Sequence, residues 1–279
     1  MSTAAQPMYE WNTLPWRKIE RKVFKLQKRI YQASSRGDVK AVHRLQRLLS
    51  RSWSAKCLSV RRVTQDNQGK RTAGVDGVKL LTPHQRCKLV GHLHLHAKAQ
   101  PIRRVWIPKP GSTEKRPLGI ATMNDRALQT LVKLALEPEW EARFEANSYG
   151  FRPGRSCHDA VAAIATGINQ RPSYVLDADI SKCFDKINQQ QLLVKLGTYP
   201  EIRWLVKGWL KAGVMDGDCL YPIEEGVPQG GPLTPPTMLQ TFLMDLSWAG
   251  IRQRSKNDPD LLFRNLHPLH QHPYQFATH

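Results

Sequence analysis

The chain has 279 residues, of which 41% are apolar, and this share excludes a wholly disordered protein. No apolar run approaches the ~20 residues that a membrane span needs, the N-terminus lacks a signal-peptide pattern, and the five cysteines form no C-x-x-C pair, which argues against a disulfide scaffold or zinc ribbon. Lys and Arg number 42 against 23 Asp and Glu, and residues 1–116 alone hold 26 basic and 6 acidic side chains. The cysteine pattern predicts a cytoplasmic protein, and the lack of a long apolar run predicts no membrane partner. The uneven charge predicts a nucleic-acid partner, although a merely solubilising surface would also be basic.

Two basic helices are expected at the start of the chain. Residues 16–30 and 39–59 each carry an apolar stripe at helical spacing, and the break between them ends at Asp38, a good N-cap. The two stripes consist of Trp16, Ile19, Val23, Leu26 and Ile30, and of Val42, Leu45, Leu48 and Leu49. We expect the stripes to form core and the outer faces to be available to phosphate groups.

The next segments alternate loops with short elements. Residues 61–79 are polar and glycine-bearing and predict an exposed loop, and residues 82–97 predict a helix that is capped by Thr82. Residues 103–120 predict a hairpin with Lys109 and Arg116 on either side of its turn. Two cations on a hairpin can clamp a triphosphate, although basic hairpins are common.

Two further helices are expected in the middle of the chain. Residues 124–146 predict a helix that is capped by Asn124 or Asp125 and kinked at Pro138. The following loop, SYGFRPGR, leads into a capping box formed by Ser156 and Asp159. Such a loop can hold a phosphate at the helix N-terminus, or it can be a plain turn and cap. The inward face of this second helix is expected to contain Ala160, Val161, Ile164 and Ile168.

A strand with two carboxylates comes next. Residues 174–187 predict a strand that runs into a turn, and period-two alternation places Asp177 and Asp179 on one face. Two carboxylates on a core strand are costly unless they bind a cation. Helices over residues 189–197 and 201–212 and a glycine- and proline-rich loop over residues 224–235 follow.

Five strings, taken in order, make the chain similar to the reverse transcriptase–maturase proteins encoded by bacterial group II introns. They are QGKRTAGVDG, IPKPGSTEKRPLGI, NSYGFRPGRSCHDA, DADISKCFDKI and GVPQGG. The resemblance covers roughly residues 10–235 and implies an α+β fold, the right-hand polymerase. It assigns residues 1–80 to a basic helical N-terminal extension, 81–170 to the fingers and 171–235 to part of the palm.

The resemblance also implies roles for single residues. Asp179 resembles the first catalytic aspartate, and Ile180 resembles the residue whose carbonyl helps to hold the metal, which in this family is Mg²⁺. Phe184 resembles the gate that lies under the sugar and excludes a 2′-hydroxyl. Gln229 resembles the palm residue that lines the nucleotide and template pocket.

Four basic residues complete the implied site. Lys109 and Arg116 resemble the fingers residues that grip the incoming triphosphate, and Arg152 and Arg155 are expected to contact the template or primer backbone. The implied partners are group II intron RNA, an RNA template and a DNA primer.

The sequence departs from the family after GVPQGG. Further catalytic carboxylates of the family come from an aromatic-Ala-Asp-Asp turn, and this chain contains no Asp-Asp dipeptide. Residues 236–279 do not resemble a palm. Under one choice of codons, a shifted frame of residues 238–247 reads Val-Ala-Asn-Ile and then His-Gly-Leu-Glu, two strings close to the family's own. We therefore expect a frameshift near Thr234–Thr237 and an out-of-frame tail.

Three functions stay open at this point. The chain is a reverse transcriptase by resemblance, expected to be inactive as a polymerase in this truncated form. Alternatively, it is a non-catalytic RNA-binding fragment that assists splicing. The third possibility is a non-functional remnant of a mobile element.

Overall fold

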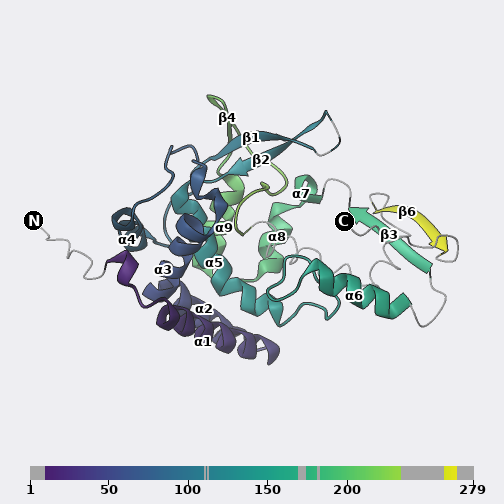
Figure 1. Ribbon diagram of the computed structural model, residues 1–279, viewed down its shortest axis with the longest axis horizontal. Coiled ribbons are helices and arrows are strands. Elements are labelled where there is room, and N and C mark those ends of the chain that lie inside the picture. The colour runs from purple at the N-terminus through teal and green to yellow at the C-terminus, as the bar shows by residue number, and fades with distance from the viewer. Residues whose placement is uncertain are drawn as a thin grey trace, which may run out of the picture. The chain divides into compact units, whose positions relative to one another are not determined.

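The computed structural model describes residues 10–109, 111, 113–168, 174–180, 183–233 and 261–268. The described residues up to Phe144 and from Phe184 to residue 233 form one compact unit, which we call the first unit. Residues 145–183 and the strand at 261–268 belong to a second unit. Figure 1 shows the elements of both units, coloured along the chain.

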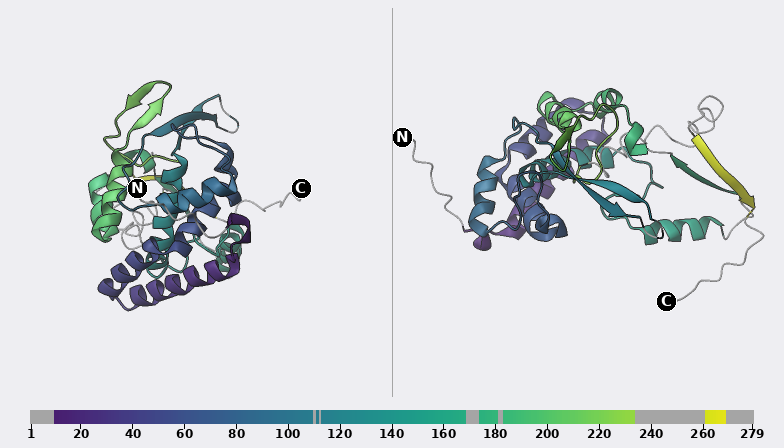
Figure 2. Two further views of the ribbon diagram at one scale, coloured as in Figure 1. Left: turned by 90° about the vertical axis from the view of Figure 1, so that its left-hand side faces the viewer. Right: turned by 90° about the horizontal axis from the view of Figure 1, so that it is seen from above.

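Helices form the larger part of the first unit. α1 packs against α2, α3 and α5, and α5 also contacts α2 and α3. α1 and α2 lie at one end of the unit and the strands β1 and β2 at the other, with α5 between them, as Figure 1 and the left view of Figure 2 show. The bounds of the helices are α1 (Trp16–Ser35), α2 (Val39–Arg51), α3 (Trp53–Arg61) and α5 (Met123–Glu141). None of the helices among the described residues combines the length and the apolar character that crossing a membrane requires.

The apolar stripe of α1 behaves as its periodicity predicts. Ile19, Val23 and Ile30 are buried, and the basic side chains between them are exposed. Asp38 caps α2 as expected, because its carboxylate accepts a hydrogen bond from the Ala41 N–H at 3.0 Å. The two predicted stripes are therefore mostly core, although Trp16 and Leu26 are half-buried and Leu48 is exposed.

The second basic helix is two helices, so the prediction of one helix over residues 39–59 is wrong. Ser52 has an extended backbone that separates α2 from α3, and its N–H bonds the Leu49 carbonyl. α3 buries most of its residues and packs on α5, whereas α2 keeps an exposed basic face. The turn at Ser52 therefore allows α3 to be buried against α5 while α2 keeps one face exposed to solvent.

The expected loop at residues 61–79 is partly helical. It begins with a π-helical turn, η2 (Arg62–Asp66), and a 3₁₀ turn, η3 (Gln68–Arg71), and Val63 is buried within it. The prediction of an irregular loop is therefore wrong for residues 61–71, although residues 65–68 are exposed as predicted.

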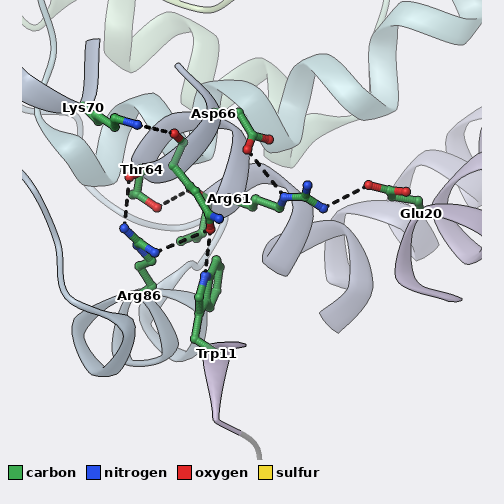
Figure 3. A network of polar contacts seen from close by, with 9 residues as sticks. Trp11, Glu20, Arg61, Thr64, Asp66, Lys70 and Arg86 are labelled. Atoms are coloured by element: carbon green, nitrogen blue, oxygen red, sulfur yellow. Dashed lines mark hydrogen bonds and ion pairs between the residues drawn. The ribbon is translucent and has the colours of Figure 1, made fainter. Parts of the chain in front are cut away.

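Polar contacts fasten this segment to the helices, as Figure 3 shows. The Arg61 guanidinium lies 3.0 Å from the Glu20 carboxylate on α1 and 3.5 Å from the Asp66 carboxylate. The Lys70 ammonium donates to the Gln65 carbonyl at 2.6 Å. A short 3₁₀ turn, η1 (Trp11–Thr13), is attached here too, since the Trp11 indole N–H donates to the Gln65 side chain at 3.0 Å.

The next helix, α4 (Pro83–His92), begins as predicted. The Thr82 hydroxyl accepts from the Gln85 N–H and the Gln85 side chain accepts from the Thr82 N–H, a complete capping box with Pro83 in the first turn. The helix ends at His92 rather than near residue 97, because Leu93 is extended and buried.

A small mixed sheet completes the first unit. Its strands are β1 (Ile102–Pro108), β2 (Lys115–Ile120), β4 (Val214–Asp216) and β5 (Cys219–Tyr221). Their order is β2-β1-β4-β5, with an antiparallel β1–β2 hairpin, a parallel β1–β4 pair and a second antiparallel hairpin. The predicted hairpin over residues 103–120 is confirmed.

α5 is capped by Thr122 and not by Asn124 or Asp125. The Thr122 hydroxyl accepts from the Asp125 N–H at 3.1 Å. Asp125 instead turns into the core, where its carboxylate accepts from the Trp209 indole N–H and the Gln100 N–H. Pro138 lies within the helix, which continues to Glu141.

Three helices precede β4 in the chain. They are α7 (Cys183–Lys186), α8 (Gln189–Leu196) and α9 (Pro200–Lys211). α8 and α9 match the predicted helices, whereas the expected turn after the aspartate strand contains the short helix α7. Gln189 is buried at the start of α8, where its side-chain amide donates to the Gly226 carbonyl at 2.9 Å.

The second unit contains one helix and two paired strands. They are α6 (Cys157–Ile168), β3 (Tyr174–Ile180) and β6 (Leu261–Pro268), and β3 and β6 are antiparallel. The predicted capping box of α6 is confirmed, since the Ser156 N–H donates to the Asp159 carboxylate at 2.7 Å and the Asp159 N–H to the Ser156 hydroxyl at 3.3 Å. Val161 and Ile164 are each 59% exposed, so the expectation that they face inward is wrong.

Candidate functional site

Lys109 and Arg116 lie on the β1–β2 hairpin. The register pairs Arg116 with Ile107, and the Lys109 N–H donates to the Glu114 carbonyl at 2.9 Å. Side chains that are directly opposite in an antiparallel pair share a face, and side chains alternate along each strand. Lys109 and Arg116 therefore lie on the same face of the hairpin as diagonal neighbours, and both are exposed.

Lys109 is engaged with an acidic neighbour. Its ammonium lies 2.6 Å from the Glu114 carboxylate, and this hydrogen bond lowers the pKa of the Glu114 carboxyl below its ordinary value. An exposed ion pair of this kind contributes little to stability. Lys109 can therefore exchange the carboxylate for a phosphate group at little cost.

The loop at residues 222–231 is tied by its backbone to two elements of the first unit. The Val227 N–H donates to the Phe184 carbonyl at 2.7 Å, and the Gly119 N–H on β2 donates to the Gln229 carbonyl at 2.7 Å. The Gly226 N–H donates to the Ile187 carbonyl at 3.0 Å. The loop thus holds Phe184 and Gln229 in one place relative to the root of the hairpin.

Two glycines allow this close approach. Gly226 has φ +75°, and a Cβ there would lie 2.6 Å from the Asp185 carbonyl oxygen and 2.7 Å from that of Phe184. Gly230 has φ +117°, and a Cβ there would collide with the Gly119 carbonyl oxygen. Both the left-handed backbone and the missing Cβ are needed at these positions.

A cleft of about 280 Å³ opens where these segments meet. Phe184 and Gln229 line it, together with Arg104 from β1 and the carboxylate-bearing residues Glu224 and Glu225. The cleft therefore offers an aromatic ring, an amide, a guanidinium and carboxylates. Arg104 and the two glutamates had no predicted role, although Glu224 and Glu225 are the first two residues of the predicted loop at residues 224–235.

Arg104 is held in place by several neighbours. Its guanidinium lies 3.4 Å from the Asp216 carboxylate on β4 and stacks near the rings of Trp106 and Tyr221, at 5.6 and 5.8 Å from their centroids. Cation–π contacts and the ion pair together restrict this side chain at the cleft wall.

Arg126 is a second residue that the sequence did not indicate. It is buried on α5, and its guanidinium donates to the carbonyls of Gly69 and Thr72, both at 2.7 Å. Arg103 on β1 donates to the Ala73 carbonyl at 3.0 Å. These bonds fix the QGKRTAGVDG segment against α5 and β1, so the segment is a braced loop.

Arg152 and Arg155 lie in the second unit, in the loop before α6. Arg152 is only 6% exposed, and its guanidinium donates to the carbonyls of Glu145 and Ser148 at 2.6 and 2.8 Å. Arg155 is more accessible, donates to the Ala146 carbonyl at 2.6 Å and lies over the Tyr149 ring. The Arg152 guanidinium is therefore bonded within its own loop, whereas Arg155 keeps an accessible surface.

Asp179 and Ile180 lie on β3 in the second unit, and their side chains fall outside the described part of the chain. The register places Asp179 opposite Leu262 and Ile180 opposite Leu261. The paired strand, LLFRNLHP, contributes no acidic residue. Among the described residues, no group of three His, Cys, Asp or Glu side chains is arranged to hold a metal ion.

Two family models match the chain. One is described as the N-terminal domain of reverse transcriptase and matches residues 11–93. The other is described as reverse transcriptase (RNA-dependent DNA polymerase) and matches residues 107–257, which is more than half of the chain. The second match includes residues 236–257, beyond the end of the motif resemblance.

Several curated proteins are similar to the chain in sequence. Protein YkfC of Escherichia coli is 34% identical over 70% of this chain and 54% of its own length. The group II intron-encoded protein LtrA of Lactococcus lactis subsp. cremoris is 36% identical over 57% of this chain and 27% of its own length. Maturase-like protein 1 of Euglena gracilis is 31% identical over 65% of this chain and 41% of its own length. The chain thus spans between about a quarter and about half of the length of these relatives.

Proposed function

The chain belongs to the reverse transcriptase family, and we propose that it is an RNA-binding protein of the group II intron-encoded type. In this proposal its first unit binds structured intron RNA through the N-terminal helices. Residues 1–279 by themselves hold a nucleotide and a template without polymerising. The fingers are residues 81–170, the palm begins at residue 171, and residues before 81 form the N-terminal extension.

The exposed face of α1 carries the RNA-binding part of this proposal. Glu20 is the single acidic residue on α1, and it lies at the Arg61 ion pair. Seven basic residues of α1 are all exposed: Arg17, Lys18, Arg21, Lys22, Lys25, Lys28 and Arg29. Two aromatic side chains, Phe24 and Tyr31, are exposed on the same helix. Cations that track phosphates and aromatic rings that stack on bases are the combination that single-stranded and structured RNA require.

The cleft supports the nucleotide-holding part. Lys109 and Arg116 bind the triphosphate, Phe184 lies under the sugar, and Gln229 borders the base. The shared face of the two hairpin cations and the backbone bonds that fix Phe184 and Gln229 both favour this assignment. Arg155 contacts nucleic-acid backbone, whereas Arg152 positions the loop that carries it.

The proposed lack of polymerase activity rests on the carboxylates. Mg²⁺ supplies charge neutralisation and activates the primer hydroxyl in polymerases, and it needs several carboxylate ligands. The sequence offers Asp179 and Asp177 but no Asp-Asp dipeptide, and β6 adds none. We assign no catalytic step to the described residues.

Salt-dependent binding of a structured RNA tests the proposal. Replacing Arg21 and Lys25 on α1 by Ala removes two phosphate contacts, and we expect the slope of log K against log salt to fall by up to about two. The matched control replaces Arg203 and Lys207 by Ala, which removes two exposed cations from α9. Equal effects of the two double variants, or an affinity that does not depend on salt, would refute the proposal.

A further inference from the structure

A groove of about 540 Å³ lies in the first unit, apart from the nucleotide cleft. It is bordered by η1, the start of α1, the start of α3 and α4. Ile19, Cys57 and Val90 form part of its floor and are buried, so the floor is apolar. The volume falls within the range that small ligands occupy in proteins.

The wall on the η1 side is fixed by its neighbours. Trp11 is buried, meets Trp16 edge-on with ring centroids 5.0 Å apart, and donates its indole N–H to Gln65. The Arg86 guanidinium lies 5.9 Å from the Trp11 ring centroid and donates to the Thr64 carbonyl, as Figure 3 shows. A groove with such a braced wall is formed before any ligand arrives.

The rim of the groove is positively charged. Lys18 and Lys22 lie one helical turn apart on α1, both are exposed, and both line the groove. None of the described residues that line it is Asp or Glu. The rim continues into the basic face of α1, so the groove opens onto the surface that is proposed to bind RNA.

The part of the groove formed by α3 has an accessible aromatic ring. Trp53, the first residue of α3, is 48% exposed, and Ser54 beside it adds a hydroxyl. Burial raises the pKa of the Cys57 thiol to about 12, so this side chain stays protonated and serves as apolar floor. The groove therefore combines a flat ring, an apolar floor and two ammonium groups.

We propose that the groove takes a single unpaired nucleotide of the bound RNA. The base stacks on Trp53 above the apolar floor, and its phosphate is bound by Lys18 and Lys22. A nucleotide is the ligand that joins a flat, weakly polar ring to an anion, and RNA is recognised chiefly through unstacked bases in loops and bulges. An apolar peptide would match the floor but would leave the two ammonium groups without a counter-charge. This inference rests on the proposed function, because it names the RNA feature that the same surface reads.

The test compares a fully paired RNA hairpin with one that has a single bulged nucleotide. In the second hairpin the bulged nucleotide is the fluorescent base 2-aminopurine, which serves as the probe. We expect the full chain to bind the bulged hairpin about tenfold more tightly than the fully paired one and to quench the probe. Trp53→Ala should remove the preference and the quenching while leaving affinity for the paired hairpin unchanged. Lys18→Ala/Lys22→Ala should lower the preference as well, whereas Lys28→Ala/Arg29→Ala, an equal charge change outside the groove, should lower affinity for both hairpins alike.

The outcomes separate this inference from the function on which it rests. Salt-dependent binding of both hairpins with equal affinity would overturn the nucleotide groove and leave the RNA-binding proposal standing. Absence of binding to either hairpin would overturn both. A third outcome is equal binding of the two hairpins together with self-association of the chain in sedimentation. If Trp53→Ala abolished this self-association, the groove would be assigned to a second copy of the chain, and the proposal would be overturned. Circular dichroism of each variant confirms that it is folded.

Discussion

Gly226 shows at the residue scale how the loop at 222–231 depends on a missing side chain. Gly226→Ala would add a left-handed alanine and a contact with two backbone oxygens, and we expect a loss of about 3 kcal/mol in the free energy of unfolding. Gly217 has φ +59° and open space around it, so Gly217→Ala should cost only about 1 kcal/mol. Urea unfolding of both variants measures the difference, and equal losses would show that the close approach is not required.

Glu139 gives a pH-dependent prediction. It is buried and bonded to Gln46 at 2.6 Å and Arg143 at 2.7 Å, yet burial raises the pKa of its carboxyl above the ordinary value. The folded protein therefore binds this proton more tightly than the unfolded chain does. Stability from Glu139 is present below the ordinary glutamate pKa and is lost as pH rises through the raised folded value.

Glu139→Gln removes this titration. In urea unfolding between pH 4 and pH 8, we expect the stability of the variant relative to wild type to rise with pH and then to level off. Glu145→Gln, at an exposed glutamate, is the matched control and should show no such trend. A constant difference between wild type and Glu139→Gln across this range would contradict the prediction.

At the scale of elements, the hairpin allows a test of which face binds the triphosphate. Lys115 neighbours Arg116 on β2 but points to the opposite face, because strand side chains alternate. We expect Lys109→Ala and Arg116→Ala each to weaken the binding of a fluorescent deoxynucleoside triphosphate about tenfold, whereas Lys115→Ala leaves it unchanged. If Lys115→Ala weakened binding as much as Arg116→Ala, general charge rather than a defined clamp would explain the affinity.

The elements that the sequence predicted best are those with local signals. The cap at Thr82 and the capping box at Ser156 were predicted because each signal lies within four residues of sequence. The break at Ser52 was not, because it depends on α3 packing against α5. The cap of α5 was misplaced for a similar reason, since Trp209, 84 residues away, draws Asp125 into the core.

The candidate site was predictable residue by residue but not as an arrangement. Sequence motifs indicated Lys109, Arg116, Phe184 and Gln229. The register of the hairpin places the first two on one face. The hydrogen bond between the Gly119 N–H and the Gln229 carbonyl joins residues 110 positions apart, and no pattern along the chain indicates it. Contacts between such distant segments are decided by tertiary packing and not by the local preferences of the sequence.

At the scale of the whole molecule, the nucleotides that encode residues 230–279 and those beyond them test the origin of the tail. We expect an open shifted frame near Thr234–Thr237 that encodes an aromatic-Ala-Asp-Asp turn. Residues 236–257 lie within the family match, so the comparison must be made on the nucleotides rather than on the protein. A shifted frame that closes at once, or one that lacks the turn, would show that the tail is the chain's own.

A primer-extension assay on one RNA template with a DNA primer tests the central claim most directly, because binding and polymerisation are read from the same sample. We expect the chain to bind the primer–template in a salt-dependent manner and the primer not to be extended when Mg²⁺ and deoxynucleotides are added. Templated extension that survives purification and is lost on Asp179→Ala would contradict it.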